Sequence, residues 1–357
     1  MDVPPIEVTY DAAGVCLPRL GLWLDPHRRQ AGAERVFVSH AHADHTGRHR
    51  EVILTDPTAR FMRVRLGGQR VEHRLPFGQP RRFTNGGAEF TITLLPAGHI
   101  LGSAMAFIEN AGATLLYTGD FKLQPSLAAE PCDFALARGC DTLIMETTFG
   151  RPQFCFPPAA TVRAEIITFC REALAAGVTP LLLAYSLGKS QEVLAGLAGA
   201  GLPIMLHYDA RKLTRIYERL GWQFPAYEPF AAAAARGKVH VGPPSLARSP
   251  LLARLAPTRS AMITGWAVDP RCRFRYGVDA AFPLSDHADF PDLVDFVKQV
   301  APKKVFTLHG STVEFARTLR ELGYDAQALG ADEQLDLVLN RNAEARMTDD
   351  ERNPKPE

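Results

Sequence analysis

Residues 36–47, VFVSHAHADHTG, place three histidines and one aspartate within six positions, directly after an apolar run. His40 and His42 are two positions apart, so on an extended strand both side chains lie on one face and can reach the same ion. Asp44 and His45 follow on an expected turn, where a second ion can bind. Imidazole and carboxylate ligands suit Zn²⁺, with Mn²⁺ or Fe as competitors. The alternative is a histidine-rich surface loop, which this order of ligand-type residues disfavours.

Further ligand-type side chains stand where other apolar strands are expected to end. His99 follows the run 90–98, Asp120 follows 114–119, and His309 comes at the end of 303–310. Each alone could be a hydrogen-bonded polar group at a strand end, but together they favour a dinuclear metal site. Asp120 is placed to bridge two ions with these ligands: His40, His42 and His99 for one, and Asp44, His45 and His309 for the other.

The elements that must position these residues can be read from hydrophobic patterns. Short apolar or alternating runs predict strands over 35–39, 51–55, 89–97, 103–109, 113–120 and 142–147. From residue 158 on, expected helices over 160–177, 187–201 and 209–221 alternate with strands over 178–186, 202–208 and 238–242. This alternation indicates a parallel sheet with crossover helices. A helix over 290–301, a strand over 303–310 and a helix over 312–323 follow.

The composition is that of a globular protein with roughly two domains, since 46% of the 357 residues are hydrophobic and 22% are charged. The 40 basic and 39 acidic residues nearly cancel, so net charge neither favours nor excludes a polyanionic partner. The six cysteines are scattered without a CxxC pair, as in proteins with reduced thiols. The first residues do not resemble a signal peptide, and no apolar run approaches the roughly 18 residues of a membrane span. We therefore expect a cytoplasmic protein without membrane contact.

The segment SHAHADH, residues 39–45, resembles the HxHxDH signature of the metallo-β-lactamase superfamily. His99, Asp120 and His309 match the remaining ligand motifs of that superfamily in order. Asp25, in LWLDP, matches its first motif, whose aspartate supports the ligands without binding metal. The resemblance implies an α/β fold, the αββα sandwich, with two metal ions at one edge of its two sheets.

Downstream residues resemble motifs A, B and C of the β-CASP branch, whose members are nucleases. Glu146, in LIMETTFG, His287, in PLSDHADF, and His309 match these motifs. The resemblance implies a metallo-β-lactamase domain in two parts, 1–152 and 269–345, with a β-CASP domain inserted over 153–268. The polar segment 346–357 is expected to be a disordered tail.

The resemblance also implies catalytic roles. His287 would be the general acid or a hydrogen-bond donor to the transition state near the scissile phosphate. Glu146 would orient it through a hydrogen bond, and Asp44 would act as a catalytic metal ligand. The alternatives are that His287 caps the helix that starts near residue 291 and that Glu146 forms a structural salt bridge. Two-metal hydrolysis of this kind leaves a 5′-phosphate and a 3′-hydroxyl.

The identity of the nucleic acid is less constrained by these residues. Eukaryotic DNA-repair members such as Artemis have valine in place of His309, whereas ribonuclease members have histidine. The strings SHAHADH, SDHADF and VFTLHG nevertheless look closest to bacterial ligase-associated DNA exonucleases, which keep this histidine. We therefore favour a 5′-to-3′ DNA exonuclease in repair or end processing, with a DNA ligase or helicase as partner. A ribonuclease is the second reading. A small-molecule metallo-hydrolase and a binding module without activity are further alternatives.

Two short segments are candidates for phosphate contacts. Arg271, Arg273 and Arg275 alternate with other residues and would share one face of an extended strand. Ser186 and Lys189 lie near the start of an expected helix, a position that favours phosphate. The alternative for the arginines is an ordinary solvated surface.

Overall fold

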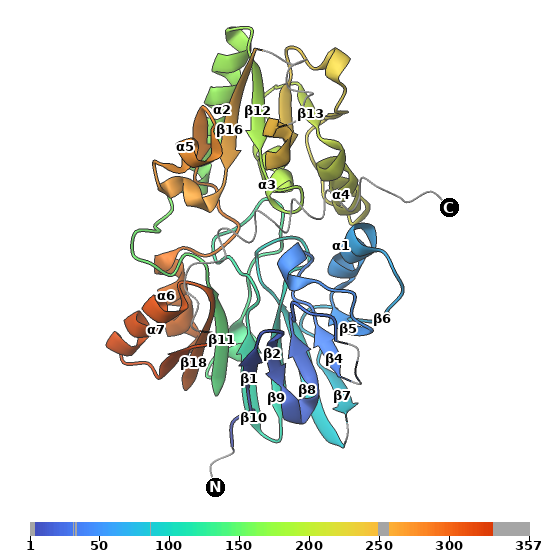
Figure 1. Cartoon of the computed structure of the whole chain (residues 1–357), viewed down its shortest axis with the longest axis vertical. Coiled ribbons are helices and arrows are strands. Elements are labelled where there is room, and N and C mark those ends of the chain that lie inside the picture. Colours follow the sequence, from blue (N-terminus) through green and yellow to red (C-terminus); the bar gives the residue numbers. More distant parts are fainter. Residues whose placement is uncertain (1–3, 31, 33, 86, 249–256, 331–357) are drawn as a thin grey trace.

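Two facing sheets form the part of the molecule that carries the sequence-predicted ligands (Figure 1). The computed structural model describes residues 4–30, 32, 34–85, 87–248 and 257–330. The first sheet contains, in spatial order, β1 (Thr9–Asp11), β2 (Gly14–Leu17), β3 (Leu22–Leu24), β4 (Arg35–Phe37), β5 (Glu51–Leu54) and β6 (Val71–Arg74). The second contains, in spatial order, β19 (Ala326–Ala328), β18 (Lys304–Gly310), β11 (Thr142–Thr147), β10 (Ala113–Tyr117), β9 (Ala104–Asn110), β8 (Ala88–Pro96) and β7 (Arg81–Asn85).

The alternation of side chains along the strands builds a core on each face of the second sheet. In β10, Leu115 and Tyr117 point into the core that the two sheets share, whereas Leu116 packs in the core on the opposite face. Phe37 and Ile53 come into the shared core from the first sheet. This period of two is what the apolar and alternating runs of the sequence predict.

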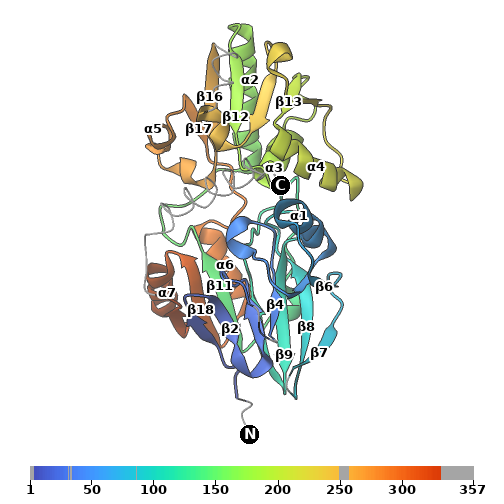
Figure 2. The same ribbon diagram turned by 45° about the vertical axis from the view of Figure 1, so that its right-hand side comes forward.

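Helices cover the outer faces of both sheets (Figures 1 and 2). On the second sheet, α6 (Phe290–Val300) and α7 (Thr312–Glu321) bury Phe296 and Phe315. On the first sheet, α1 (Asp56–Leu66) buries Phe61 and Met62. The order helix, sheet, sheet, helix confirms the expected αββα sandwich.

The third sheet is entirely parallel and forms, with its helices, the upper part of Figure 1. Its strands, in spatial order, are β14 (Glu228–Pro229), β13 (Ile204–Leu206), β15 (Val239–Gly242), β12 (Thr179–Leu183), β16 (Thr258–Ile263) and β17 (Ala280–Phe282). Its helices are α2 (Ala159–Ala175), α3 (Lys189–Gly196), α4 (Tyr208–Arg219) and α5 (Cys272–Tyr276). We call these elements the parallel-sheet unit. It has the βα alternation that the sequence predicts.

The parallel-sheet unit continues beyond residue 268, the expected end of the inserted domain. β17 pairs with β16 in parallel, with Ala261 opposite Ala280 and Ile263 opposite Phe282. We therefore propose that the inserted domain ends after β17. The expected tail, 346–357, lies outside the described residues.

The parallel-sheet unit packs against the sandwich through α4 and α1. The rings of Tyr217 and Phe61 are 5.3 Å apart between centroids, and Ile216 is buried in the same core as Met62. The Tyr217 hydroxyl also accepts a hydrogen bond from the backbone N–H of Leu101, two residues beyond His99. Within the described part of the chain, no helix has both the length and the apolar character needed to cross a membrane.

Candidate metal centre

The predicted ligands meet because their strands end at one edge of the sandwich. His40 and His42 follow β4, His99 follows β8, and Asp120 follows β10. Strand β8 runs in the same direction as β10, because each is antiparallel to β9. The carboxyl ends of strands that run in the same direction lie at the same edge of a sheet, and this edge faces the parallel-sheet unit.

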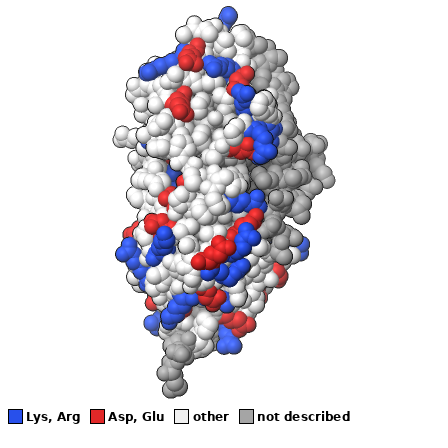
Figure 3. All heavy atoms as spheres, turned by 90° about the vertical axis from the view of Figure 1, so that its left-hand side faces the viewer, with Lys and Arg blue, Asp and Glu red and all other residues white. Residues whose placement is uncertain are grey.

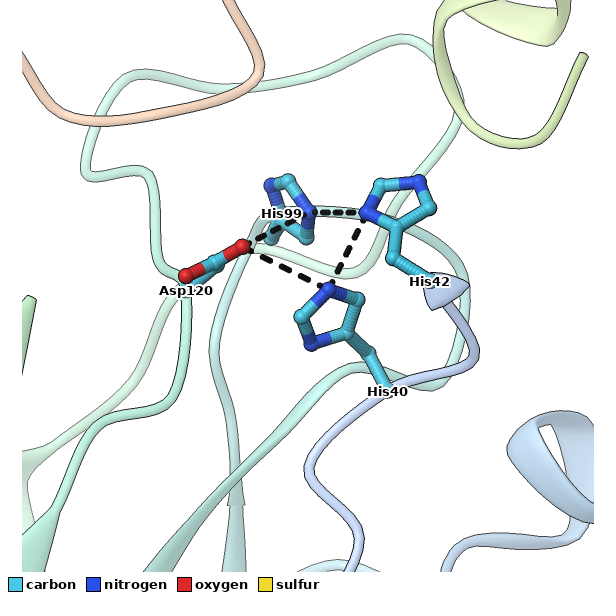
Figure 4. A group of neighbouring side chains, drawn as sticks. All are labelled: His40, His42, His99 and Asp120. Atoms are coloured by element: carbon cyan, nitrogen blue, oxygen red, sulfur yellow. Dashed lines mark hydrogen bonds and ion pairs between the residues drawn. The ribbon is translucent and has the colours of Figure 1, made fainter. Parts of the chain in front are cut away.

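Four of the predicted side chains form a compact cluster, the first ligand group (Figure 4). Nδ1 of His42 is 3.0 Å from Nε2 of His40 and 3.0 Å from Nε2 of His99. Oδ2 of Asp120 lies 3.4 Å from Nε2 of His40 and 3.8 Å from Nε2 of His99. His40, His99 and Asp120 are buried and His42 is half-buried.

The partners on the far side of each ring fix the tautomer of the neutral imidazole, in which the facing nitrogens carry lone pairs. Nε2 of His42 lies 3.2 Å from the Leu187 carbonyl and Nδ1 of His99 lies 2.8 Å from the Asp286 carbonyl. A carbonyl only accepts, so each of these ring nitrogens is the N–H donor. The lone pairs of Nδ1 of His42 and Nε2 of His99 therefore point at each other.

His40 has the same arrangement. Its Nδ1 is 2.9 Å from the Ser39 hydroxyl, which itself donates to the Asp25 carboxylate. Nδ1 of His40 is therefore a donor, and its Nε2 turns a lone pair toward the cluster. Three converging lone pairs and one carboxylate repel one another unless a cation lies between them. The donor set thus fits a divalent ion such as Zn²⁺, which prefers imidazole and carboxylate ligands in tetrahedral geometry.

Burial holds the three imidazoles in the neutral form that binds metal. It lowers the pKa of His99 to about 3, with further contributions from His287 and His42. Burial also lowers the pKa of His40 and of His42. Protons therefore do not compete for these nitrogens near neutral pH.

The second predicted group is adjacent but less compact. Oδ2 of Asp120 lies 3.3 Å from Nε2 of His45, and that nitrogen is 3.9 Å from Oδ2 of Asp44. The ring centroids of His45 and His309 are 5.5 Å apart. Three tight groups of possible ligands occur among the described residues, and Asp44, His45 and His309 belong to none of them. A single Asp120 oxygen nevertheless faces histidines of both predicted groups, as a bridging ligand must.

The carboxylates around His45 favour the protonated form of its ring. Burial lowers the pKa of His45, but the carboxylates of Asp120, Asp44 and Asp25 outweigh it and raise the pKa well above its usual range. Because Nδ1 of His45 donates to Asp25 over 2.9 Å, its Nε2 is the atom that faces Asp120 and Asp44.

A bulge in the second sheet places His309. In the pairing of β11 with β18, Glu146 is opposite Leu308 and Thr147 is opposite Gly310, so His309 is the extra residue. Its φ of 56° lies in the left-handed region. Bulges re-aim side chains in this way at the ends of strands, and here the ring turns toward His45.

Asp25 lies beneath the ligands rather than among them. Its carboxylate accepts hydrogen bonds from the Ser39 N–H at 2.7 Å, from the Tyr117 hydroxyl at 3.0 Å, and from His45. Asp25 is buried and thereby fixes the orientation of His40, through Ser39, and of His45. This is the supporting position that the sequence resemblance implied.

Glu146 and His287 are brought together at the same edge. Nδ1 of His287 lies 2.9 Å and 3.0 Å from the two oxygens of the Glu146 carboxylate. The His287 ring centroid is 4.6 Å from that of His99, so the pair borders the first ligand group. Burial lowers the pKa of His287, but Glu146, Asp120 and Asp286 outweigh it and raise the pKa to about 10. These carboxylates therefore favour the protonated form of His287.

The expected phosphate contact of Lys189 is wrong. Lys189 is 1% exposed, and its ammonium lies 3.0 Å from Oδ1 of Asp286 and 2.8 Å from the carbonyl of Leu284. Its charge is already neutralised in the interior. Ser186 is half-buried, and its carbonyl accepts a hydrogen bond from Gln191 over 3.1 Å.

The expected strand through Arg271, Arg273 and Arg275 is also wrong, because these residues belong to the start and body of the short helix α5. All three are exposed. Arg271 and Arg275 pair with Asp269, at 3.1 Å and 3.5 Å. A role of Arg271, Arg273 and Arg275 in binding nucleic acid stays a prediction.

Several residues of the site were not foreseen. Asp286 holds His99 through its backbone, Tyr117 holds Asp25, and Nδ1 of His27 lies 3.0 Å from the Asp44 carbonyl. The sequence offers one signal for Asp286, since it precedes His287 as Asp44 precedes His45. The other contacts depend on packing.

Comparisons with known proteins agree with this geometry. Residues 280–329 match the family described as the Zn-dependent metallo-hydrolase RNA specificity domain. A Probable DNA ligase of Opitutus terrae is 52% identical over 336 residues, which cover 94% of this chain and 32% of that protein.

More distant relatives are named as nucleases. The 5′ exonuclease Apollo of Gallus gallus is 30% identical over 312 residues, 85% of this chain and 64% of Apollo. The Probable RNase MJ4 of Methanocaldococcus jannaschii is 25% identical over 375 residues, 82% of this chain and 86% of that protein. This chain thus spans 32% of the length of the ligase relative and 64% of that of Apollo.

Proposed function

Because the chain belongs to the β-CASP branch of the metallo-β-lactamase superfamily, we propose that it is a metal-dependent DNA exonuclease that degrades DNA from the 5′ end. The chain carries the buried His and Asp cluster of a Zn-dependent metallo-hydrolase. The observation that carries the nuclease proposal is the Glu146–His287 pair, which sets a protonated imidazole beside that cluster.

We propose the ligand assignment that the sequence predicts. His40, His42 and His99 would hold one divalent ion, Asp44, His45 and His309 a second, and Asp120 would bridge them. Zn²⁺ is the preferred ion and Mn²⁺ the competitor. When bound, such ions lower the pKa of a water molecule and offset negative charge on a phosphoryl group.

The protein's own side chains supply the proton. Glu146 accepts the Nδ1 proton of His287, so the imidazole is held in one orientation with its Nε2 proton free to be donated. As water adds its oxygen to phosphorus and gives up a proton to solvent, the bond from phosphorus to the 3′ oxygen breaks. His287 passes its proton to that leaving oxygen, so one product ends in a 3′-hydroxyl and the other carries a 5′-phosphate. Asp25 keeps the rings of His40 and His45 in place throughout.

Aromatic side chains next to His287 support a nucleic-acid substrate. The ring centroid of Phe149 is 6.0 Å from that of His287, and Trp266 follows at 4.6 Å from Phe149. Phe154 lies 5.4 Å from Trp266, and both side chains are partly exposed. Nucleobases stack on such rings in proteins that bind single strands.

The face of the molecule that Figure 3 shows carries both kinds of charge. Acidic and basic side chains lie beside one another there. On this face, binding would therefore depend on local stacking and ion contacts more than on a basic track.

The names of the relatives support DNA as the substrate and a ligase as the partner. One relative is named a DNA ligase and another a 5′ exonuclease. We place the activity in DNA repair or end processing, together with a DNA ligase or helicase. The second candidate is a ribonuclease, which the RNA specificity domain matched by residues 280–329 favours, as does a relative named an RNase.

A cleavage assay tests the proposal. The metal-loaded protein is given 3′-labelled single-stranded DNA and RNA of one sequence, each with and without a 5′-phosphate. Asp44→Ala is the inactive control. Stepwise shortening of DNA from its 5′ end is expected, and preferential cutting of RNA would promote the ribonuclease. Failure to cut either polymer with Zn²⁺ or Mn²⁺ would overturn both and point to a small-molecule substrate.

A further inference from the structure

Residues 187–192, in the loop before α3 and its first turn, contact the back of the first ligand group. The Leu187 carbonyl accepts the Nε2 proton of His42 over 3.2 Å. Two residues on, the Lys189 ammonium lies 3.0 Å from Oδ1 of Asp286. Asp286 in turn accepts the Nδ1 proton of His99 at its backbone carbonyl, over 2.8 Å. Two of the three histidines are thus oriented from the parallel-sheet unit, one directly and one through Asp286.

A second arm of the same network reaches the residues just before His99. Glu192 lies 2.9 Å from the Lys122 ammonium and 4.0 Å from that of Lys189. The backbone N–H of Lys122 donates to the Ala97 carbonyl over 2.9 Å. A Cβ on Gly98 would come within 2.2 Å of the Lys122 carbonyl, so the two segments touch closely there.

The charges of this network lie in the interior. Lys189 is 1% exposed, Glu192 2% and Lys122 4%, so each ammonium depends on its carboxylate partner. Lys189 also donates to the Leu284 carbonyl over 2.8 Å, and this fixes the segment that leads into Asp286. Because Lys189 contacts both Asp286 and the Leu284 carbonyl, its position fixes the backbone around Asp286.

We propose that Lys189 is a positioning residue for the metal site: it holds Asp286 against His99 and so couples docking of the parallel-sheet unit to metal affinity. The coupling is reciprocal, because any contact that favours the metal-bound arrangement is itself favoured by the metal. Groups that orient a ligating histidine typically contribute about tenfold to a hundredfold in metal affinity. The inference rests on the metal site of the proposed function and not on its substrate.

Zn²⁺ binding to the full-length apo-protein, measured by competition with a chromophoric chelator, tests this inference without nucleic acid. Lys189→Met is expected to weaken Zn²⁺ binding about tenfold to a hundredfold. The double variant Lys189→Met/Asp286→Asn removes both charges and so leaves no unpaired ion in the interior. If the single variant does not fold, the double variant provides the test. Lys238→Met is the matched control, because Lys238 pairs with Glu228 at 2.6 Å within the same unit.

Hydrogen exchange on the wild-type protein gives an independent readout. In the wild type, addition of Zn²⁺ is expected to slow amide exchange over residues 187–192. In the double variant, Zn²⁺ should slow exchange in this segment much less. A folded double variant that binds Zn²⁺ as tightly as the wild type would overturn the proposal, and so would wild-type exchange in this segment that ignores Zn²⁺. Both readouts are independent of cleavage, so a failed nuclease assay leaves them standing.

Discussion

His287 and Glu146 are 141 residues apart in the chain, yet Nδ1 of the imidazole lies 2.9 Å from one carboxylate oxygen and 3.0 Å from the other. Glu146 is itself held by the Phe121 N–H, which donates to it over 2.8 Å. A carboxylate fixed in this way determines the orientation of the imidazole and favours its protonated form. The pair therefore separates two roles: His287 donates the proton, and Glu146 holds the His287 ring in place.

Substitutions of this pair should slow chemistry without releasing metal. His287→Ala is expected to lower the rate of the cleavage step about 10²- to 10⁴-fold, the usual contribution of a general acid. Glu146→Gln should cost about tenfold to a hundredfold, and the double variant should be no slower than His287→Ala. Single-turnover cleavage with metal analysis checks this.

The pH profile distinguishes orientation from mere structural support. Glu146 raises the pKa of His287, so Glu146→Gln lowers it, and the proton needed for cleavage is lost at lower pH. The alkaline limb of the rate profile should therefore move to lower pH in Glu146→Gln. An unchanged limb would mean that His287 is not the acid.

The ligand positions could be predicted because they depend on local features. A histidine two residues after another shares its face of a strand, and carboxyl ends of parallel strands share an edge. These local features are enough to predict that four side chains cluster: His40, His42, His99 and Asp120. The sandwich likewise follows from the period-two and helical patterns in the sequence.

The supporting contacts could not be predicted, since they join distant segments through backbone atoms. The carbonyls of Leu187 and Asp286 lie 145 and 187 residues from the histidines that they orient. A carbonyl has no side-chain signature, so only the fold shows which one is used. The phosphate contact predicted for Lys189 is wrong for a related reason: a position near the start of a helix favours phosphate, but packing buries this side chain.

The segment 271–275 shows a different limit. Alternating arginines fit a strand face, but a five-residue helix is equally compatible with so short a segment. The stop signal was Gly277, which takes the left-handed conformation, with φ of 63°, after the helix.

Asp120→Asn should reduce metal content as well as activity. Oδ2 of Asp120 faces His40 at 3.4 Å and His45 at 3.3 Å, so the loss of its charge weakens both ligand groups. We expect at least one ion per chain to be lost and cleavage to fall by about 10²-fold or more. Metal analysis after gel filtration checks this, with the exposed Asp295→Asn as control. Full metal content in Asp120→Asn would contradict the bridging role.

His49 should make the fold sensitive to acid. Its Nδ1 accepts the Gln30 N–H over 3.3 Å, and its buried Nε2 has no hydrogen-bond partner among the residues that the structure describes. Burial lowers the pKa of His49 from 6.5 to about 4, with the nearby arginines Arg70 and Arg29 adding to the shift. The unfolded chain therefore takes up this proton first, and stability is lost as the pH falls from about 6.5 to about 4.

His49→Gln keeps an acceptor for Gln30 but cannot titrate, so it isolates this contribution. Urea unfolding of both proteins in chelator, from pH 7.5 down to pH 4.5, compares them without metal. The free energy of unfolding of His49→Gln should rise relative to that of the wild type as the pH is lowered. Two curves that stay parallel would show that His49 does not carry the effect.

Trp266 should contribute to binding single-stranded DNA. Its ring lies 4.6 Å from that of Phe149, which reaches His287, so a base stacked there would sit beside the scissile phosphate. Loss of one stacked base costs about 1–3 kcal/mol, so Trp266→Ala should weaken binding about fivefold to a hundredfold. Fluorescence anisotropy with a labelled oligonucleotide measures this, in a His287→Ala background in which cleavage is slowed about 10²- to 10⁴-fold. Tyr208→Ala, an aromatic 61% exposed on α4, is the control, and equal affinities for the two variants would exclude stacking at Trp266.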